Sequence, residues 1–214
     1  MEARFQVGTA KAKITPSTDI GPVFRAGYKM GEAEQLRDVV DDLYARCLTI
    51  EHEDARVVFL SLDLVGLFRD FTLDLAKLLE PRGVKLEQLV VATTHTHSGP
   101  DTMGLWGPSI EKSGFNDEYG DYLLQVSAET VANALAAARP AQAYFAFDEM
   151  NLGVANYRRP DDLNLDLWCL TFKAGTETIG SLFSYPAQPE LAPRHDDRIS
   201  AGYPGEACAV LDRE

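Results

Sequence analysis

The chain has 214 residues and a formal net charge of −13, from 33 acidic and 20 basic side chains. Hydrophobic residues make up 45% and charged residues 25%, a globular composition that excludes disordered, collagen-like and coiled-coil chains. The length predicts a single domain over residues 1–214 with a core of its own. Because the acidic surface repels phosphate groups, we expect no nucleic acid among the partners. No apolar run approaches the ~20 residues that a membrane span needs, so no membrane span is expected.

The three cysteines are too far apart in sequence to suggest a disulfide framework or a cysteine-based zinc site. Cys47 and Cys169 lie in apolar, strand-like runs and are expected to be buried. The N-terminus has no apolar signal-peptide core, so we expect a cytoplasmic protein.

The first half of the chain predicts a strand–helix–strand unit. After short strands near the N-terminus, residues 16–36 are a loop rich in glycine and proline, and Leu43–Ile50 alternates as a strand does. Val57–Leu62 and Leu89–Thr94 are continuous apolar runs, typical of strands buried on both faces. Between them, apolar residues at helical spacing predict a helix over residues 68–79. This order predicts neighbouring parallel central strands with the helix packed across them.

The second half predicts one long helix followed mainly by strands. Residues 99–116 form a long loop, and Asp117–Ala138 carries the apolar stripe of a helix that ends at Arg139–Pro140. Three strands are predicted next: Gln142–Phe147, Leu167–Phe172 and Thr178–Tyr185. A short helix that begins near Pro204 follows them. The fold class is therefore α/β, with a mixed, largely parallel central sheet and flanking helices.

Two of the four histidines, His95 and His97, directly follow the second apolar run. Residues two apart in an extended backbone point to the same face, so both imidazoles should project together from the carboxyl end of a strand. Ligand sites of open α/β sheets form at that edge, and two imidazoles there can bind zinc. We expect the pair to line a cleft with the 99–116 loop. The alternative is a chance pair at a strand end.

Other polar residues allow two interpretations each. Asp63 follows a buried strand and either supports a metal ligand or, as we favour, caps the following helix. Arg158 lies between predicted strands and either clamps a polar head group or lies in a solvated turn. His195 lies in a charge-rich loop and is expected to be solvated, whereas His52 is a hairpin residue without a functional signal.

Several segments together resemble the N-terminal part of the catalytic domain of the neutral/alkaline non-lysosomal ceramidase family. The likeness runs over the whole chain, and the Thr-His-Thr-His-Ser-Gly-Pro segment is its most specific motif. The matching segments are Val7–Lys11 with Ile14–Pro16, Ala26–Tyr28, Leu43–Arg46, Val57–Asp63, Thr94–Pro100 and Ile199–Gly205.

The resemblance implies a zinc-dependent amide hydrolase that splits N-acylsphingosine into sphingosine and a fatty acid. It implies zinc as the cofactor, with His95 as a zinc ligand, and His97 as the neighbouring catalytic group that stabilises the oxyanion or contacts substrate. Arg158 would bind the substrate head group. The chain would then be the first half of a larger catalytic domain, truncated relative to the family, with a lipid-like amide as its substrate.

Three departures from the family pattern leave the ligand set incomplete. The family's second zinc histidine stands in a His-Pro pair, where this chain has Gln188-Pro189, and Gly202 replaces the aspartate of the later segment. A glutamate and a tyrosine ligand lie in the second half of the family's domain. His195 would take the place of the missing second histidine only if the loop that carries it is rebuilt. We therefore expect zinc to be weakly bound or absent in the isolated chain, with a second chain or a missing C-terminal half as partner. The alternative function is a non-catalytic, diverged half-domain that acts as a binding or interaction module.

Overall fold

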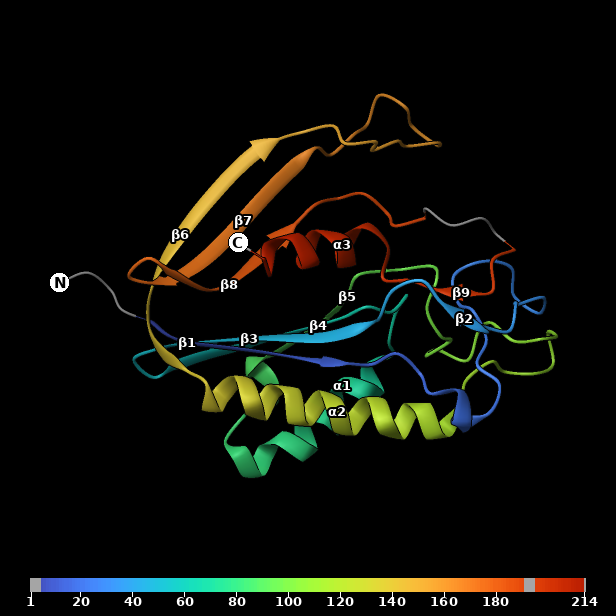
Figure 1. Ribbon diagram of the computed structural model, residues 1–214, viewed down its shortest axis with the longest axis horizontal. Coiled ribbons are helices and arrows are strands. Elements are labelled where there is room, and N and C mark those ends of the chain that lie inside the picture. The colour runs from blue at the N-terminus through green and yellow to red at the C-terminus, as the bar shows by residue number, and fades with distance from the viewer. Residues whose placement is uncertain (1–4, 191–194, 214) are drawn as a thin grey trace.

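In the computed structural model, which describes residues 5–190 and 195–213, a curled sheet of seven strands is flanked by helices (Figure 1). The strands lie side by side in the order β5-β4-β3-β1-β6-β7-β8. Their bounds are β1 (Phe5–Lys13), β3 (Tyr44–His52), β4 (Ala55–Leu62), β5 (Leu89–Thr93), β6 (Arg139–Glu149), β7 (Asp166–Ala174) and β8 (Glu177–Ser184). A separate parallel pair consists of β2 (Asp38–Val39) and β9 (Arg198–Ile199).

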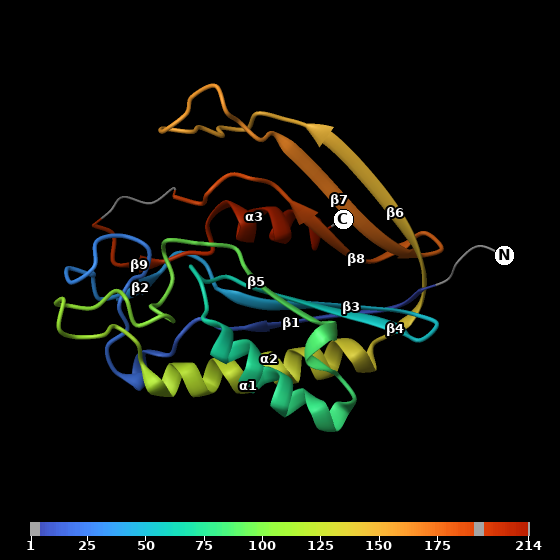
Figure 2. The same cartoon turned by 180° about the vertical axis from the view of Figure 1, so that it is seen from behind.

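The three α-helices lie on two sides of the flat part of the sheet. They are α1 (Arg69–Leu79), α2 (Asp117–Ala136) and α3 (Gly202–Leu211), with short 3-10 turns at Thr18–Ile20, Glu80–Arg82 and Leu86–Gln88. Both opposite views show α1 and α2 under β1, β3 and β4, whereas α3 lies on the other side of these strands (Figures 1 and 2).

The main core lies between this sheet face and the two helices below it. Its fully buried side chains include Leu75 and Leu79 of α1, Leu123 and Val131 of α2, and Leu60 of β4. Burying each such aliphatic side chain contributes about 1.5–3 kcal/mol. The predicted helix over residues 68–79 therefore packs against the apolar run of β4, as expected, and the long helix α2 contributes to the same core.

The predicted mixed α/β architecture and its strand–helix–strand unit are confirmed, with two corrections. Strands β4 and β5 pair in parallel, and α1 connects them. However, β5 is an edge strand and not a central one. Every other neighbouring pair in the described sheet is antiparallel, so "largely parallel" is wrong. Two of these antiparallel pairs follow directly from their connections, because tight turns join β3 to β4 and β7 to β8, and a tight turn allows only antiparallel pairing.

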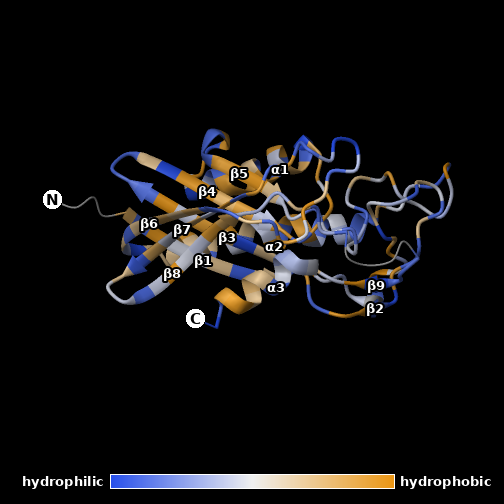
Figure 3. Ribbon diagram, turned by 90° about the horizontal axis from the view of Figure 1, so that it is seen from above, coloured by the Kyte–Doolittle hydropathy of each residue, from blue (hydrophilic) through white to orange (hydrophobic). Residues whose placement is uncertain are grey.

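Strands β6, β7 and β8 curl away from the flat sheet and return over its second face. Seen from above, they cross over β1 and β3 (Figure 3). The hydroxyl of Thr9 donates to the carbonyl of Ile179, 3.0 Å away, which joins β1 to β8. A smaller apolar cluster fills the space between the layers: Val7, Leu48, Ala141 and Phe172. Among the described residues, no helix has the length and apolar character to cross a membrane.

Candidate active site

His95 lies just beyond β5, in a left-handed backbone conformation with φ of 64°. The sequence predicted an extended backbone here, and that expectation is wrong. The turn is held because the His95 amide donates to the carbonyl of Leu64, 2.9 Å away. The imidazoles of His95 and His97 nevertheless come together, with ring centroids 5.0 Å apart and an edge-to-face arrangement. The predicted pairing is therefore present, but a turn produces it.

The exposed imidazole of His95 is oriented by one backbone carbonyl. Its Nδ1 lies 2.6 Å from the carbonyl oxygen of Val65. Because a carbonyl oxygen only accepts hydrogen bonds, Nδ1 carries a proton, and in the neutral tautomer that this bond selects the lone pair is on Nε2. Metal-binding histidines are commonly held in this way, with one nitrogen donating to the protein and the other facing the metal.

His97, in contrast, is only 5% exposed and is in contact with the C-terminal loop. The amide nitrogen of Gln188 lies 3.0 Å from Nε2 of His97 and 2.9 Å from a carboxylate oxygen of Glu190. Since the amide donates, Nε2 accepts and Nδ1 carries the proton. This buried Nδ1 makes no hydrogen bond, although Glu190 lies 3.4 Å away. Burial lowers the pKa of His97, which the charge of Glu190 opposes, so the ring is neutral at pH 7.

Hydrogen bonds from the buried side chain of Arg25, which is 3% exposed, hold the segment around His97 in place. Its Nε donates to the carbonyl of His97 at 2.6 Å, Nη2 to the hydroxyl of Ser98 at 3.2 Å, and Nη1 to the carbonyl of Asp196 at 2.9 Å. Three loops distant in sequence thus meet at one guanidinium. The sequence predicts only a loop over residues 16–36, because nothing in its pattern distinguishes a buried arginine from an exposed one.

Two further neighbours shape the surroundings of the His97 ring. The ring of Tyr28 packs edge-on against it at 5.1 Å between centroids. Gly27 lies so close that a β-carbon built there would be 2.5 Å from the imidazole. The glycine is therefore required both for this close approach and for its φ of 100°.

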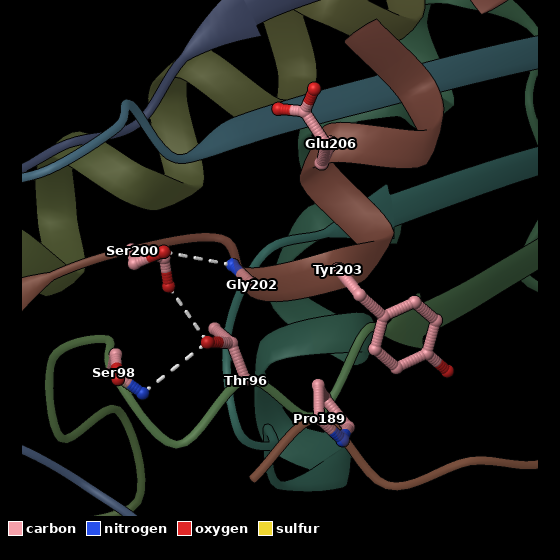
Figure 4. A pocket seen from close by; sticks show the side chains of 7 residues that line it. All are labelled: Thr96, Ser98, Pro189, Ser200, Gly202, Tyr203 and Glu206. Carbon is pink, nitrogen blue, oxygen red and sulfur yellow. Dashed lines mark hydrogen bonds between the residues drawn. The ribbon is translucent and has the colours of Figure 1, made fainter. Parts of the chain in front are cut away.

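A pocket of about 330 Å³ lies beside the histidine segment, at the start of α3 (Figure 4). The Thr96 hydroxyl donates to the carbonyl of Ser200 at 2.7 Å and accepts from the Ser98 amide at 3.3 Å, so this wall is a hydrogen-bonded frame. The lining residues are Thr96, Ser98, Pro189, Ser200, Gly202, Tyr203 and Glu206.

A second pocket of about 460 Å³ is lined by the 25–34 loop together with Glu190 and His195. Neither His95 nor His97 lines either pocket, and residues 99–116 line neither. The predicted cleft between the histidines and the 99–116 loop stays a prediction. The two pockets are lined instead by the 25–34 loop, by Thr96 and Ser98, and by residues of the ranges 189–190 and 195–206.

Asp63 does not cap the following helix, contrary to the interpretation favoured from sequence. The residue at the cap of α1 is Phe68, which provides no side-chain bond. The carboxylate of Asp63 is instead fully buried, and it accepts from Arg46 at 2.6 Å and from the Tyr44 amide at 2.9 Å. Burial raises the pKa of Asp63, and the charge of Arg46 opposes that rise. Asp63 is thus half of a buried ion pair that links β3 to the end of β4.

Among the described residues, neither Arg158 nor His195 makes a hydrogen bond or ion pair with His95 or His97. Arg158 is exposed on the loop between β6 and β7, where its amide donates to the side chain of Asn156 at 3.1 Å. Its predicted role in binding substrate stays a prediction. His195 is solvated, as expected, and its Nδ1 lies 3.1 Å from a carboxylate oxygen of Glu34.

The described residues do not form a complete set of metal ligands. Among them, no three histidine, cysteine, aspartate or glutamate side chains are grouped so that they could hold a metal ion. Catalytic zinc sites normally have about three protein ligands. Gln188, which replaces the expected second histidine, contacts His97. Gly202 has a φ of 64°, a conformation in which an aspartate would be strained. A closed zinc site on this part of the chain does not fit.

No protein-family model matches the sequence, and no curated protein matches it. Solved structures do match, among them neutral ceramidase from Pseudomonas aeruginosa and a ceramidase complexed with C2. Each superposes with a TM-score of 0.77 and 21% sequence identity over 94% of this chain. The chain spans about a third of the length of these structures, 34% in both cases. The fold that the resemblance implied is therefore confirmed: the chain folds like part of a neutral ceramidase.

Proposed function

We propose that the chain is part of a zinc-dependent amide hydrolase that acts on a lipid-like N-acyl substrate, with His95 as one zinc ligand. The observation that carries this proposal is the orientation of His95 within a ceramidase-like fold. Its Nδ1 is committed to the carbonyl of Val65, so Nε2 is available to a metal. The remaining ligands would come from a second chain or a missing C-terminal half.

His97 would stabilise the developing oxyanion or contact the substrate. Donating a hydrogen bond from Nε2 requires a proton on that atom, whereas here Nε2 accepts from Gln188. The Gln188 amide must therefore release Nε2, and the ring must move its proton from Nδ1. Zinc, when bound, would polarise the amide carbonyl and activate a water molecule. Arg158 would present its planar donor fork to the polar head group.

A second candidate function is a non-catalytic binding module. It is favoured by Gln188, whose amide occupies the nitrogen that His97 would need for catalysis. The pocket at the start of α3, of about 330 Å³, is within the size range of small-molecule sites and would be the binding site in that case.

Calorimetric zinc titration distinguishes the two functions. We expect weak zinc binding by the chain, its loss in His95→Ala, and no change in the matched control His52→Ala. His52 is suitable because it lies at the far end of β3 and packs on Phe5, with ring centroids 5.2 Å apart. A third variant, His195→Ala, shows whether that exposed imidazole contributes.

Fatty-acid release from an N-acylsphingosine should be undetectable for the isolated chain, because an incompletely held ion does not place its water for attack. Equal zinc affinity in His95→Ala would contradict the proposed ligand. Absence of any zinc binding would favour the binding module. Tight stoichiometric zinc with robust turnover would show that this chain alone completes the site.

A further inference from the structure

Strands β3, β4 and β5 carry an apolar row on the face of the sheet that α1 and α2 do not cover. Leu48 of β3 lies opposite Phe59 of β4, which lies opposite Val90 of β5, so these three side chains point to the same side. Leu48 is 6% exposed, Phe59 is partly buried, and Val90 is 42% exposed. Val57, two residues before Phe59, is also exposed. Exposure therefore increases from β3 toward β5, the last strand on this side of the described sheet.

The increase follows from where the returning strands end. A β-carbon added at Gly180 of β8 would lie 3.8 Å from Cδ1 of Leu48, which places β8 against β3. In the view from above, β6, β7 and β8 cross over β1 and β3, and β4 and β5 lie beside them (Figure 3). Strand β3 is thus covered on both faces, whereas Val57 and Val90 face outward without such a cover among the described residues.

The sequences of β4 and β5 are typical of strands that are buried on both faces. Val57–Leu62 is apolar except for Ser61, and Leu89–Ala92 is apolar throughout, whereas a strand with one solvated face alternates between apolar and polar residues. The two strands are also a parallel pair joined by a helix, and such strands are normally covered by helices on both faces. Both features predict a second layer on the outer side of β4 and β5.

Helix α3 already lies on that side of the sheet (Figures 1 and 2). The helix is largely apolar, and its last residues, Ala209, Val210 and Leu211, are exposed. A largely apolar helix is normally packed against further elements. Helix α3 therefore begins a helical layer that a neighbouring helix would continue over β4 and β5.

We propose that Val57, Phe59 and Val90, the outer β4–β5 face, are the docking face for an amphipathic helix of the polypeptide that completes the ceramidase-like domain. The matched region makes up 34% of the solved ceramidase chains, so further polypeptide accompanies the fold there. A helix is the fitting occupant because helices cover the opposite face of the same strands. Its apolar stripe would pack on the three side chains, and its polar side would face solvent. This inference is independent of the zinc proposal.

The probe is a synthetic peptide with the sequence of residues 68–82, which includes α1. This sequence is chosen because α1 already packs its apolar stripe on the other face of β4. Methyl NMR of the chain observes the binding: Val57 and Val90 report on the outer β4–β5 face, and the fully buried Val58 reports on the face under α1. We expect saturable chemical-shift changes at Val57 and Val90 and none at Val58.

A control peptide tests whether the apolar stripe of the helix is required. It carries Leu75→Asp and Leu79→Asp, the two α1 positions that are fully buried in the chain. Because an ionised carboxylate is costly to place against apolar side chains, this peptide should leave the methyl signals of Val57 and Val90 unchanged.

Lysine variants of the chain test whether the apolar row is responsible. Val90→Lys and Val57→Lys each place a charge on the outer β4–β5 face and should weaken peptide binding at least about fivefold. Both side chains are exposed, so the variants should keep their fold, which urea unfolding verifies. Val40→Lys is the matched control, because Val40 is an exposed valine that follows β2, and it should bind the peptide as the unaltered chain does.

Several results would overturn the proposal. No change at Val57 and Val90 with the peptide at millimolar concentration would do so, as would equal binding by both folded lysine variants and the unaltered chain. Changes at Val58 would show that the peptide displaces α1 and does not dock on the outer β4–β5 face. Self-association in sedimentation that Val90→Lys abolishes would assign the face to a second copy of this chain. Changes caused by phosphatidylcholine vesicles, without peptide binding, would assign it to a lipid surface.

Discussion

At the scale of single residues, the surroundings of His97 depend on a glycine with no room for a side chain. We predict that Gly27→Ala destabilises the chain by about 1–3 kcal/mol, because the new β-carbon would overlap the imidazole at 2.5 Å. Urea unfolding measures the loss. Gly175→Ala is the control, since Gly175 also has a positive φ but has nothing within 4 Å of the added carbon. Equal losses in both variants would mean that backbone strain alone is responsible.

The carboxylate of Asp196 should make stability depend on pH in the acid range. It accepts hydrogen bonds from the backbone amide of Arg198 at 3.0 Å and from its guanidinium at 2.9 and 2.8 Å. These bonds lower the pKa of Asp196 from 3.8 to about 2. Because the pKa of this carboxyl group is lower in the folded than in the unfolded chain, the charged group stabilises the folded state at pH values above its unfolded pKa. This contribution is lost as the pH falls through about 2.

We therefore predict that Asp196→Asn lowers the free energy of unfolding above pH 4 and converges with the unaltered chain near pH 2. Urea unfolding from pH 2 to pH 6 measures the difference. Asp197→Asn is the matched control, because Asp197 is an exposed neighbour. A difference between Asp196→Asn and the unaltered chain that is constant with pH would contradict the assignment.

The residue types of the candidate site could be found from sequence, but their geometry could not. The spacing of His95 and His97 correctly indicated that their rings lie together. The left-handed turn at His95 was missed because a histidine with positive φ leaves no sequence signal. Arg25 was missed because its importance comes from long-range bonds to the 97–98 and 196 segments. Asp63 was misassigned because a carboxylate after a strand fits a helix cap and a buried ion pair equally well.

At the scale of elements, α2 provides a test of local helix capping. The side-chain oxygen of Asn116 accepts from the Tyr119 amide at 2.9 Å, and its amide nitrogen donates to the carbonyl of Ile20 at 2.9 Å. We predict that Asn116→Ala costs about 1 kcal/mol, measured by thermal and urea unfolding. Asn116→Ser keeps a capping oxygen and loses only the amide donor to the carbonyls of Ile20 and Pro22, so it should cost less. An alanine variant as stable as the unaltered chain would contradict the cap.

Elements with strong periodicity were predicted nearly to their ends. The long helix was expected at Asp117–Ala138 and is found at Asp117–Ala136. The strand–helix–strand unit was predicted because two apolar runs flank one amphipathic segment. The proportion of parallel strand pairs was overestimated, because an apolar run does not indicate which other strand it pairs with in the sheet. The pairings of β1 with β3 and β6, and of β6 with β7, join strands that long connections separate, so no local turn in the sequence indicates their direction.

At the scale of the whole molecule, the sheet divides into a protected and an open part. Strands β1, β3 and β4 are covered on one face by α1 and α2, and the returning strands cross over the other face of β1 and β3 (Figures 1 and 3). The far part of β6 is exposed on both faces. We expect amide hydrogen exchange to be slower in β3 and β4 than in residues 143–149 of β6, whose side chains are exposed. Uniformly slow exchange in all strands would contradict this division.

The central claim is that this chain contributes His95 to a zinc site whose other ligands lie elsewhere. X-ray absorption at the zinc edge tests it most directly, because the spectrum of the zinc-loaded chain counts imidazole and oxygen neighbours of the metal. We predict one or two imidazole nitrogens, with oxygen completing the coordination, and loss of the imidazole signal in His95→Ala. A site with three or more protein ligands, or an imidazole signal that persists in His95→Ala, would contradict the account.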